Sequence, residues 1–386
     1  MLVPGWTGSK EDFLTLLPEI AARGRAVVAL DQRGQFETAG PDDPNAYSLD
    51  ELAEDLLAVA SAMSPDPVDL VGHSFGGLVA ARAVVRRPLA VSSLVLLCSG
   101  PGALAADRHP ELKAVADALE ASDLQATWSA MRRQERASGA AMPPDDVEAW
   151  LERRFLTGNP VALHAKTRHL IEAPDHRWLL AETPTPVLVL AGELDDGWPV
   201  TVQSAMAADI GAELELLDGL GHSPAVEDPI RTAAHLGSFW DRWSGPATTF
   251  SAVLGGATSD VPRARHLVRS SLGSDLDDED HQDAELLTSE LVTNAIIHAR
   301  PPVVLTGVMR GEILLVMVAD AGGGPTIQSR RDHGRGLPIV SAVSRRCGAW
   351  TDSHGTTAWF WLRVPQASGN AGSSPEPPSG SSPAHG

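Results

Sequence analysis

The sequence predicts an α/β protein with two domains, and three observations carry this prediction. The chain has 386 residues, more than one ordinary domain needs. Short apolar runs alternate with helical patterns in residues 1–243, and a different order of elements begins near residue 248. Hydrophobic residues make up 43% of the chain, which is enough for buried cores and excludes wholesale disorder.

The composition limits the cellular compartments and the classes of partner that we expect for this protein. The formal net charge of -20 repels phosphate backbones, so we expect no nucleic-acid partner. Cys98 and Cys347 lie far apart, which excludes a disulfide framework and a zinc pattern. No apolar run is long enough to span a bilayer, and Met1–Trp6 does not resemble a signal peptide. These absences predict a cytoplasmic protein with no membrane partner.

Apolar runs in the first domain predict a parallel sheet. The expected strands are Ala26–Leu30, Val68–Val71, Leu94–Cys98, Pro186–Leu190 and Leu214–Leu217. Helical patterns at Leu49–Met63 and Leu78–Arg87 lie between them, and buried runs that alternate with helices are typical of a parallel sheet covered on both faces. Residues 105–182 hold helical patterns and no strand candidate, which predicts a helical cap over a site.

Ser74 is the first candidate catalytic residue. It lies in Gly72-His73-Ser74-Phe75-Gly76, after a predicted strand and before a predicted helix. Glycines at both ends permit a turn too tight for Cβ atoms, and such a turn projects the serine hydroxyl above the sheet. The sequence therefore predicts a nucleophile elbow.

A serine nucleophile needs a base and an acid that orients the base. The predicted strand Pro186–Leu190 is followed by Gly192-Glu193-Leu194-Asp195-Asp196, where Asp195 is the expected acid and Asp196 the alternative. His222 comes after the next strand, on a loop flanked by glycine, and is the expected base. The order Ser, Asp, His along the chain fits a nucleophile elbow of this kind.

Residues 1–243 thus resemble the α/β-hydrolase superfamily. The resemblance implies that Ser74 attacks the carbonyl of a small acyl substrate, with the backbone N–H groups of Phe75 and Trp6 as the oxyanion hole. Family members usually carry His-Gly where this chain has Pro4-Gly5. Leu2–Trp6 matches the end of the family's third strand, so the first two strands are missing from this sequence. Either translation starts further upstream, which we expect, or the domain lacks the strands that cover one edge of its sheet.

A second pattern of elements occupies residues 248–365. It predicts strands at Phe250–Leu254, Val303–Val308 and Ile313–Val318, and helices at Val261–Leu272 and Gln282–Ala299. Ser244–Ala247 is the expected linker, and the Gly-, Ser- and Pro-rich residues 366–386 are expected to be a disordered tail.

Polar residues in this second domain indicate a nucleotide site. Glu290 and Asn294 are spaced i, i+4 and so share one helix face; asparagine is a neutral oxygen ligand suited to Mg²⁺. Asp320 follows a strand and precedes a run of glycines that includes Gly322 and Gly324. Gly334-Arg335-Gly336 begins a helix whose N–H groups can hold phosphates.

In this order, these elements resemble the GHKL (Bergerat-fold) ATPases, in particular the bacterial anti-sigma-factor serine kinases. The resemblance implies an α/β sandwich that binds ATP with Mg²⁺ on Asn294. It also implies Glu290 as general base and Asp320 as acceptor for the adenine amino group. The lid and phosphate residues would be Gly322, Gly324, Gly334, Arg335 and Gly336, and Thr357 would lie in the adenine pocket.

Three interpretations of the whole chain follow. The first is an ester-type serine hydrolase fused to an ATP-dependent serine/threonine kinase. The second is a regulatory protein that binds a sigma factor or its antagonist, with the hydrolase domain as a ligand sensor. The third is two neighbouring genes joined in error. The resemblance of the second domain also allows a homodimer.

Overall fold

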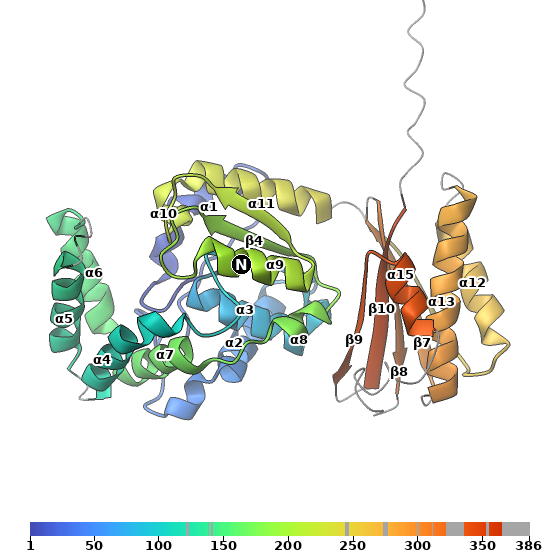
Figure 1. Cartoon of the computed structure of the whole chain (residues 1–386), viewed down its shortest axis with the longest axis horizontal. Coiled ribbons are helices and arrows are strands. Elements are labelled where there is room, and N and C mark those ends of the chain that lie inside the picture. The colour runs from blue at the N-terminus through green and yellow to red at the C-terminus, as the bar shows by residue number, and fades with distance from the viewer. Residues whose placement is uncertain are drawn as a thin grey trace, which may run out of the picture.

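The computed structural model describes residues 1–120, 123–137, 139, 142–243, 247–272, 277–298, 301–310, 312–321, 336–352 and 355–364. It is an α/β structure with two sheets, one parallel and one antiparallel (Figure 1). The mixed α/β fold class expected from the sequence is confirmed.

Five parallel strands form the first sheet, in the order β1-β2-β3-β4-β5. Their bounds are β1 Leu2–Val3, β2 Val68–His73, β3 Val91–Leu97, β4 Val187–Gly192 and β5 Glu213–Leu217. The central strands are buried on both faces, which explains their continuous aliphatic sequences. Because all strands run the same way, the loops that follow β2, β4 and β5 meet at one edge of the sheet.

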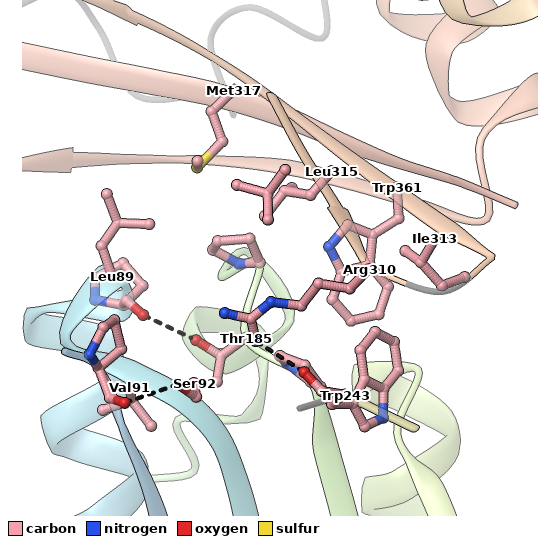
Figure 2. A pocket seen from close by; sticks show the side chains of 15 residues that line it. Leu89, Val91, Ser92, Thr185, Trp243, Arg310, Ile313, Leu315, Met317 and Trp361 are labelled. Atoms are coloured by element: carbon pink, nitrogen blue, oxygen red, sulfur yellow. Dashed lines mark hydrogen bonds between the residues drawn. The ribbon is translucent and has the colours of Figure 1, made fainter. Parts of the chain in front are cut away.

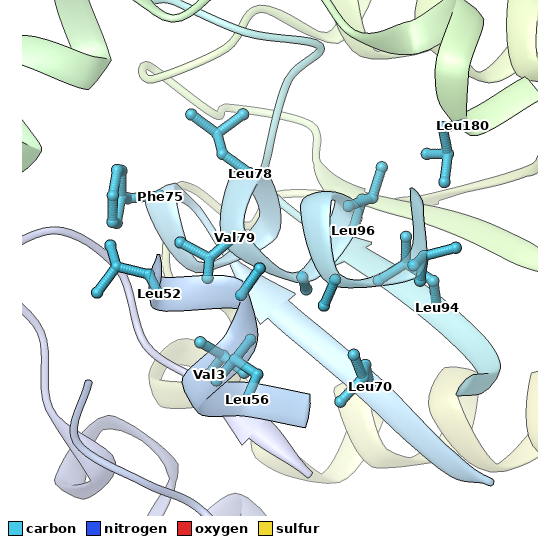
Figure 3. Packing of buried hydrophobic residues seen from close by; sticks show 14 of the residues in the cluster. Val3, Leu52, Leu56, Leu70, Phe75, Leu78, Val79, Leu94, Leu96 and Leu180 are labelled. Carbon is cyan, nitrogen blue, oxygen red and sulfur yellow. The ribbon is translucent and has the colours of Figure 1, made fainter. Parts of the chain in front are cut away.

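Helices cover both faces of this sheet. On one face lie α2 (Leu49–Met63), α3 (Phe75–Arg86) and α9 (Val200–Ile210). Figure 3 shows Leu52, Leu56 and Val79 of these helices packed over Leu70 and Leu94 of the strands. On the other face lie α1 (Leu16–Ala21) and α11 (Pro229–Trp243). The remaining short elements are α10 (Pro224–Glu227) and the 3-10 turns Lys10–Phe13, Pro44–Tyr47, Pro88–Ala90 and Ala106–Arg108.

The strand predicted at Ala26–Leu30 is not formed, which corrects the sequence-based prediction. Only an isolated bridge joins Ala29 to Leu2, with hydrogen bonds from Leu2 N to Val28 O at 2.8 Å and from Leu30 N to Leu2 O at 3.3 Å. Val28 is 38% exposed. Among the described residues no strand pairs with the outer side of this segment, so it has ladder partners on one side only.

Helices alone make up the described part of residues 105–182. They are α4 (His109–Glu120), α5 (Leu124–Ala137), α6 (Asp145–Thr157), α7 (Pro160–Glu172) and α8 (Arg177–Ala181). The first four pack on one another through Leu119, Trp128, Phe155 and Leu163, whereas α8 packs on α3 and α9. The indole Nε1 of Trp6 donates to Leu163 O at 3.4 Å, so α7 is attached to the loop that follows β1.

The second sheet is antiparallel, in the order β6-β7-β8-β10-β9. Its strands are β6 Thr248–Leu254, β7 Val303–Arg310, β8 Ile313–Asp320, β9 Arg346–Asp352 and β10 Gly355–Arg363. One face packs on α12 (Asp260–Ser271), α13 (Asp278–His298) and α15 (Gly336–Val343). The predicted tail at 366–386 and most of the predicted linker, residues 244–246, lie outside the described residues.

The other face of the antiparallel sheet packs against the hydrolase-like domain (Figure 1). Side chains alternate along a strand, so β10 turns Phe360 towards the helices and Trp361 the other way. Trp361 packs against Trp243 at the end of α11, with ring centroids 5.0 Å apart and the ring planes tilted by 34°, and Trp359 Nε1 donates to Glu182 O at 2.7 Å. Both indoles thus join the two domains.

In the part of the chain that the structure describes, no helix is long and apolar enough to cross a membrane.

Lys166 on α7 carries a prediction about stability. Its side chain is fully buried, and among the described residues its ammonium group donates one hydrogen bond, to Arg33 O at 3.1 Å. Burial lowers the pKa of Lys166 from 10.5 to about 7. Below pH 7 the lysine is charged in both the folded and the unfolded protein. The folded protein is then destabilised by the full free energy of removing the charged ammonium group from water. This cost disappears as the pH rises from the folded pKa to the unfolded pKa.

We therefore expect Lys166→Met to raise the free energy of unfolding by about 3 kcal/mol near pH 6, and by much less near pH 9. Urea unfolding at both pH values measures the difference. An effect of equal size at both would contradict a charged, buried lysine.

Candidate active site

The turn after β2 has the geometry of a nucleophile elbow. Ser74 has φ 53 and ψ -122, a strained conformation for a residue with a Cβ atom. A Cβ at Gly76 would lie 2.5 Å from the carbonyl oxygens of Val3 and Pro4, and one at Gly72 would lie 2.5 Å from Gly76 O. Glycine is therefore required at both positions, and the turn presents Ser74 at the start of α3.

His222 and Asp195 form a hydrogen-bonded pair at the same edge of the sheet. His222 Nδ1 donates to Asp195 Oδ1 at 2.6 Å. The Asp195 side chain is fully buried, whereas that of His222 is 28% exposed. With Nδ1 held by the carboxylate, Nε2 is left free to accept a proton. This is the arrangement that a general base needs.

Asp195, and not Asp196, is the partner of His222. Asp195 also accepts hydrogen bonds from Gly197 N at 2.8 Å and from Gln203 Nε2 at 2.7 Å. The Asp196 side chain is 79% exposed and lies near Arg108. The alternative left open by the sequence is therefore decided in favour of Asp195.

A hydrogen bond from a side chain to the backbone joins the turn of Ser74 to the loop of His222. His73, next to Ser74, donates from Nε2 to His222 O at 2.7 Å, and the two imidazole rings are 5.1 Å apart. Burial and the neighbouring His222 lower the pKa of His73 to about 4, so His73 is neutral at pH 7. Among the described residues, Ser74 Oγ makes no hydrogen bond to His222. Such contacts are often long without substrate and shorten when substrate binds.

Backbone N–H groups suited to an oxyanion lie beside Ser74. Phe75 is the first residue of α3, and the first N–H groups of a helix have no partner within it. A Cβ at Gly5 would lie 3.1 Å from Ser74 Cβ, so the turn that carries Trp6 lies against the nucleophile. The structure thus brings the turn that carries Trp6 close to Ser74, and Phe75 follows Ser74 at the start of α3; the role of their N–H groups as an oxyanion hole stays a prediction.

Two buried glutamines orient that turn, and sequence reasoning missed both. Gln35 Nε2 donates to Gly5 O at 2.6 Å and to Trp6 O at 3.0 Å, and Gln32 Nε2 donates to Pro4 O at 2.8 Å. Each glutamine is 3% exposed. These bonds fix the direction of the carbonyl groups and, with them, the planes of the adjoining peptides. Nothing in the local sequence marks a glutamine as the partner of a turn about 30 residues away.

We expect Gln35→Ala to lower kcat about 10-fold to 100-fold with little change in KM, because the loosened turn no longer holds its N–H group towards the oxyanion. Gln35→Glu keeps the shape but removes the donor, and it should show a similar loss. Steady-state kinetics on an ester, with urea unfolding as a control for stability, tests this. An unchanged kcat in both variants would show that the turn needs no such support.

Two further residues missed from the sequence lie behind the pair. Gln203 on α9 is fully buried and bonds both Asp195 and Trp198 O. Cys98, after β3, has φ 48 and accepts from Gly192 N at 3.4 Å, while its Sγ lies 3.6 Å from Gly221 O. Burial and the charge of Asp195 raise the pKa of the Cys98 thiol well above its usual value. Cys98 therefore remains a protonated thiol that contacts both loops.

In the second domain the strand register corrects one predicted residue. Thr356 pairs directly with Asp320, whereas Thr357 pairs with Ala319. Paired residues share a face, so Thr356 and Asp320 both face the helices, where they are 2% and 6% exposed. Thr357 faces the opposite way, on the same side as Trp359 and Trp361. The threonine beside Asp320 is therefore Thr356 and not Thr357, a difference of one residue that reverses the face.

Glu290 and Asn294 lie half-buried on α13, next to its buried stripe. Gly336 begins α15, which packs on α13. Gly322, Gly324, Gly334 and Arg335 lie outside the described residues. The described part of the predicted nucleotide site therefore consists of one face of α13, the end of β8, the start of α15 and the start of β10.

Comparison with known proteins supports both halves. Residues 1–236 match the model of the alpha/beta hydrolase family, and residues 256–361 match that of a histidine kinase-like ATPase domain. The proline iminopeptidase of Clostridium botulinum is 24% identical over 248 residues, which cover 59% of this chain and 84% of that protein. The pimeloyl-[acyl-carrier protein] methyl ester esterase of Methylococcus capsulatus is 30% identical over 245 residues, which cover 62% and 93%.

Solved structures agree on the fold of the first part. An esterase from Exiguobacterium antarcticum superposes with a TM-score of 0.54 at 19% identity, over 62% of this chain and 90% of that one. This likeness shows the fold alone. The chain belongs to the alpha/beta hydrolase family and carries, after its hydrolase domain, a histidine kinase-like ATPase domain.

Proposed function

We propose that the first domain is a serine hydrolase for esters of small acyl groups. The observation that carries this is the bond between His222 and the buried Asp195, at the sheet edge where the strained Ser74 lies. The relatives above are named as an esterase and a peptidase, and both names imply attack on an acyl carbonyl.

In this proposal Ser74 Oγ attacks the acyl carbonyl while His222 Nε2 takes its proton and Asp195 stabilises the imidazolium. Phe75 N–H and Trp6 N–H receive the negative charge on the carbonyl oxygen. The tetrahedral intermediate expels the alcohol, which His222 protonates. Water then attacks the acyl-enzyme with His222 again as base, and the carboxylic acid leaves.

The test is turnover by the full chain on p-nitrophenyl esters of increasing acyl length, beside prolyl p-nitroanilide. We expect ester hydrolysis above the buffer rate and a preference for one range of acyl lengths. Turnover of the anilide alone would replace the esterase assignment by a peptidase. No turnover of any of them would contradict the proposed function.

For the second domain we propose binding of ATP with Mg²⁺. Asn294 would hold the metal, Glu290 would act as general base, and Asp320 with Thr356 would hold the adenine. The buried Asp320 is suited to accept from an adenine amino group, and the Thr356 hydroxyl, 3.1 Å from Thr351 Oγ1, lies beside it. Mg²⁺ would supply charge neutralisation on the phosphates.

The metal assignment gives a direct prediction. Asn294→Ala should weaken Mg-ATP binding at least about 10-fold, because Mg²⁺ loses its protein oxygen ligand. ATP without Mg²⁺ should bind the variant and the wild type alike. Gln282→Ala, at an exposed position of the same helix, is the matched control. Calorimetric titration with and without Mg²⁺ measures both, and Mg²⁺-dependent binding that survives in Asn294→Ala would refute this ligand.

We further propose that this domain phosphorylates a serine or threonine of a partner, of the sigma-factor antagonist class, and that it does so as a monomer or a homodimer. Incubation of the full chain with radiolabelled ATP and candidate antagonists tests the activity. Transfer of label that disappears in Glu290→Gln would support it. Binding without transfer would leave a nucleotide-controlled binding protein instead.

A regulatory function is the second candidate, and the docking of the two domains favours it. The antiparallel sheet packs on the hydrolase domain through Trp359, Trp361 and Trp243. A ligand that alters this contact would alter ATP affinity, and ATP would alter its affinity equally. ATP titrations with and without saturating acyl ligand test the coupling, and an unchanged ATP affinity would remove it.

A further inference from the structure

A cavity of about 160 Å³ lies between the two domains, remote from the triad (Figure 2). The hydrolase domain forms one wall with residues at the starting ends of β3 and β4. The ATPase sheet forms the other wall with the outward side chains of β7, β8 and β10. The lining of the cavity includes Leu89, Arg310, Leu315, Met317 and Trp361.

The walls of the cavity are mostly apolar. Figure 2 shows Leu315 and Met317 of β8 pointing from the sheet towards the hydrolase domain. The two lining hydroxyl groups already have partners, since Ser92 Oγ donates to Pro67 O at 2.9 Å and Thr185 Oγ1 to Pro88 O at 3.2 Å. Neither hydroxyl hydrogen is therefore available to a ligand.

Arg310 is the exception among the lining residues. Its Nη1 donates to Trp243 O at 2.9 Å, but its buried Nε has no hydrogen-bond partner. Among the described residues, no carboxylate forms an ion pair with Arg310 and no aspartate or glutamate lines the cavity. The Arg310 side chain is half-buried, and a carboxylate placed beside such an unpaired guanidinium forms charge-assisted hydrogen bonds, which are stronger than bonds between neutral groups.

We propose that this cavity binds a small monocarboxylate, with its carboxylate on Arg310 and its apolar body against Leu315, Met317 and Trp361. An apolar cavity of about 150 Å³ holds a molecule the size of benzene, so an acid with one ring or a short aliphatic chain fits and a nucleotide does not. A single cation favours one carboxylate over two. A neutral molecule of the same shape leaves the Arg310 guanidinium without an ionic partner.

The class of ligand matches the acid that ester hydrolysis releases. This link rests on the proposed function of the triad, whereas binding itself does not. A ligand held by both domains also stabilises the docked arrangement by mass action.

Calorimetric titration of the full chain with benzoate tests the site. We expect saturable binding with a dissociation constant on the order of 1 mM or tighter, and benzyl alcohol should bind at least about 10-fold more weakly. Arg310→Gln should weaken benzoate binding at least about 10-fold and leave benzyl alcohol unchanged. Arg363→Gln, an exposed arginine on the same sheet, is the matched control and should bind benzoate as the wild type does.

Leu89→Trp is a second test of the site, which remains informative if the Arg310→Gln variant does not fold. Leu89 is 54% exposed at the rim, so a larger side chain there should fill the cavity from outside and weaken benzoate binding. Crystals soaked in 3-bromobenzoate locate the ligand by the anomalous signal of bromine. A peak beside Arg310 is the expected result.

A bromine peak only at Ser74, equal benzoate affinity in Arg310→Gln, or no binding at tens of millimolar would each overturn the proposal. The two proposals fail separately. If the chain binds benzoate through Arg310 but hydrolyses no ester, the carboxylate site is supported and only its connection with ester hydrolysis is refuted. If the chain hydrolyses esters but does not bind benzoate, the proposed hydrolase function is supported and the carboxylate site is refuted.

Discussion

Replacing Ser74 by alanine is expected to lower kcat for ester hydrolysis about 10⁵-fold to 10⁶-fold. The reason is that the variant cannot form the acyl-enzyme on Ser74, so only the oxyanion donors and substrate binding remain to accelerate attack by water. Assays with the p-nitrophenyl ester that the wild type hydrolyses fastest measure the decrease in kcat. An initial burst of nitrophenol, expected for the wild type, should be absent from the variant.

Ser61→Ala is the control for this experiment, because Ser61 is exposed on α2 and has no part in the site. It should retain the wild-type kcat within about twofold. Binding of a non-hydrolysable substrate analogue should survive in Ser74→Ala. A Ser74→Ala variant that hydrolyses esters within about 10-fold of the wild type would show that another residue is the nucleophile.

Asp195→Asn is expected to lower kcat about 10⁴-fold while the fold is retained. Asparagine can donate to His222 Nδ1, which would favour the wrong tautomer, and it cannot stabilise the imidazolium that forms when His222 takes a proton. The same substitution also weakens the contacts with Gly197 N and Gln203 Nε2, since both now meet a neutral oxygen or an amide group.

Asp196→Asn is the matched control, because it makes the same chemical change one residue further along the same loop. Its side chain is 79% exposed, so kcat should change by less than about twofold. Steady-state kinetics of the pair, with thermal unfolding of each, separates catalysis from stability. Equal losses in both variants would mean that the loop as a whole, rather than the bond to His222, matters.

The parallel sheet and its catalytic loops could be predicted because local patterns specify them. Aliphatic runs mark strands buried on both faces, and the glycines around Ser74 are required by contacts at 2.5 Å. The loops with Asp195 and His222 follow successive strands, so parallel topology brings them to one edge. Only the choice between Asp195 and Asp196 needed the structure, because burial distinguishes two identical neighbours.

Other features depend on contacts between distant parts of the chain. Gln32 and Gln35 bond to a turn about 30 residues earlier, and no periodicity marks them. Ala26–Leu30 has a strand-like composition but lies at the edge, where one neighbour is insufficient for a full ladder. The preference for Thr356 over Thr357 follows from strand register, which two adjacent threonines do not reveal. The strands β9 and β10 were not predicted as strands at all.

The packing of one domain on the other was also beyond the sequence. Trp359 and Trp361 are spaced as outward residues of a strand, but what covers them is decided by Trp243 and Glu182, more than 100 residues earlier. The cavity beside Arg310 exists only because the two domains meet, so no local pattern indicates it.

The most direct test of the central claim is covalent labelling of the full chain with a fluorophosphonate, which reacts with activated serine hydroxyls. Peptide mass spectrometry should place a single adduct on Ser74. Labelling should be lost in Asp195→Asn and retained in Asp196→Asn. An adduct on another serine, or no adduct under conditions that label a known serine esterase, would contradict the assignment of Ser74, His222 and Asp195 as a working triad.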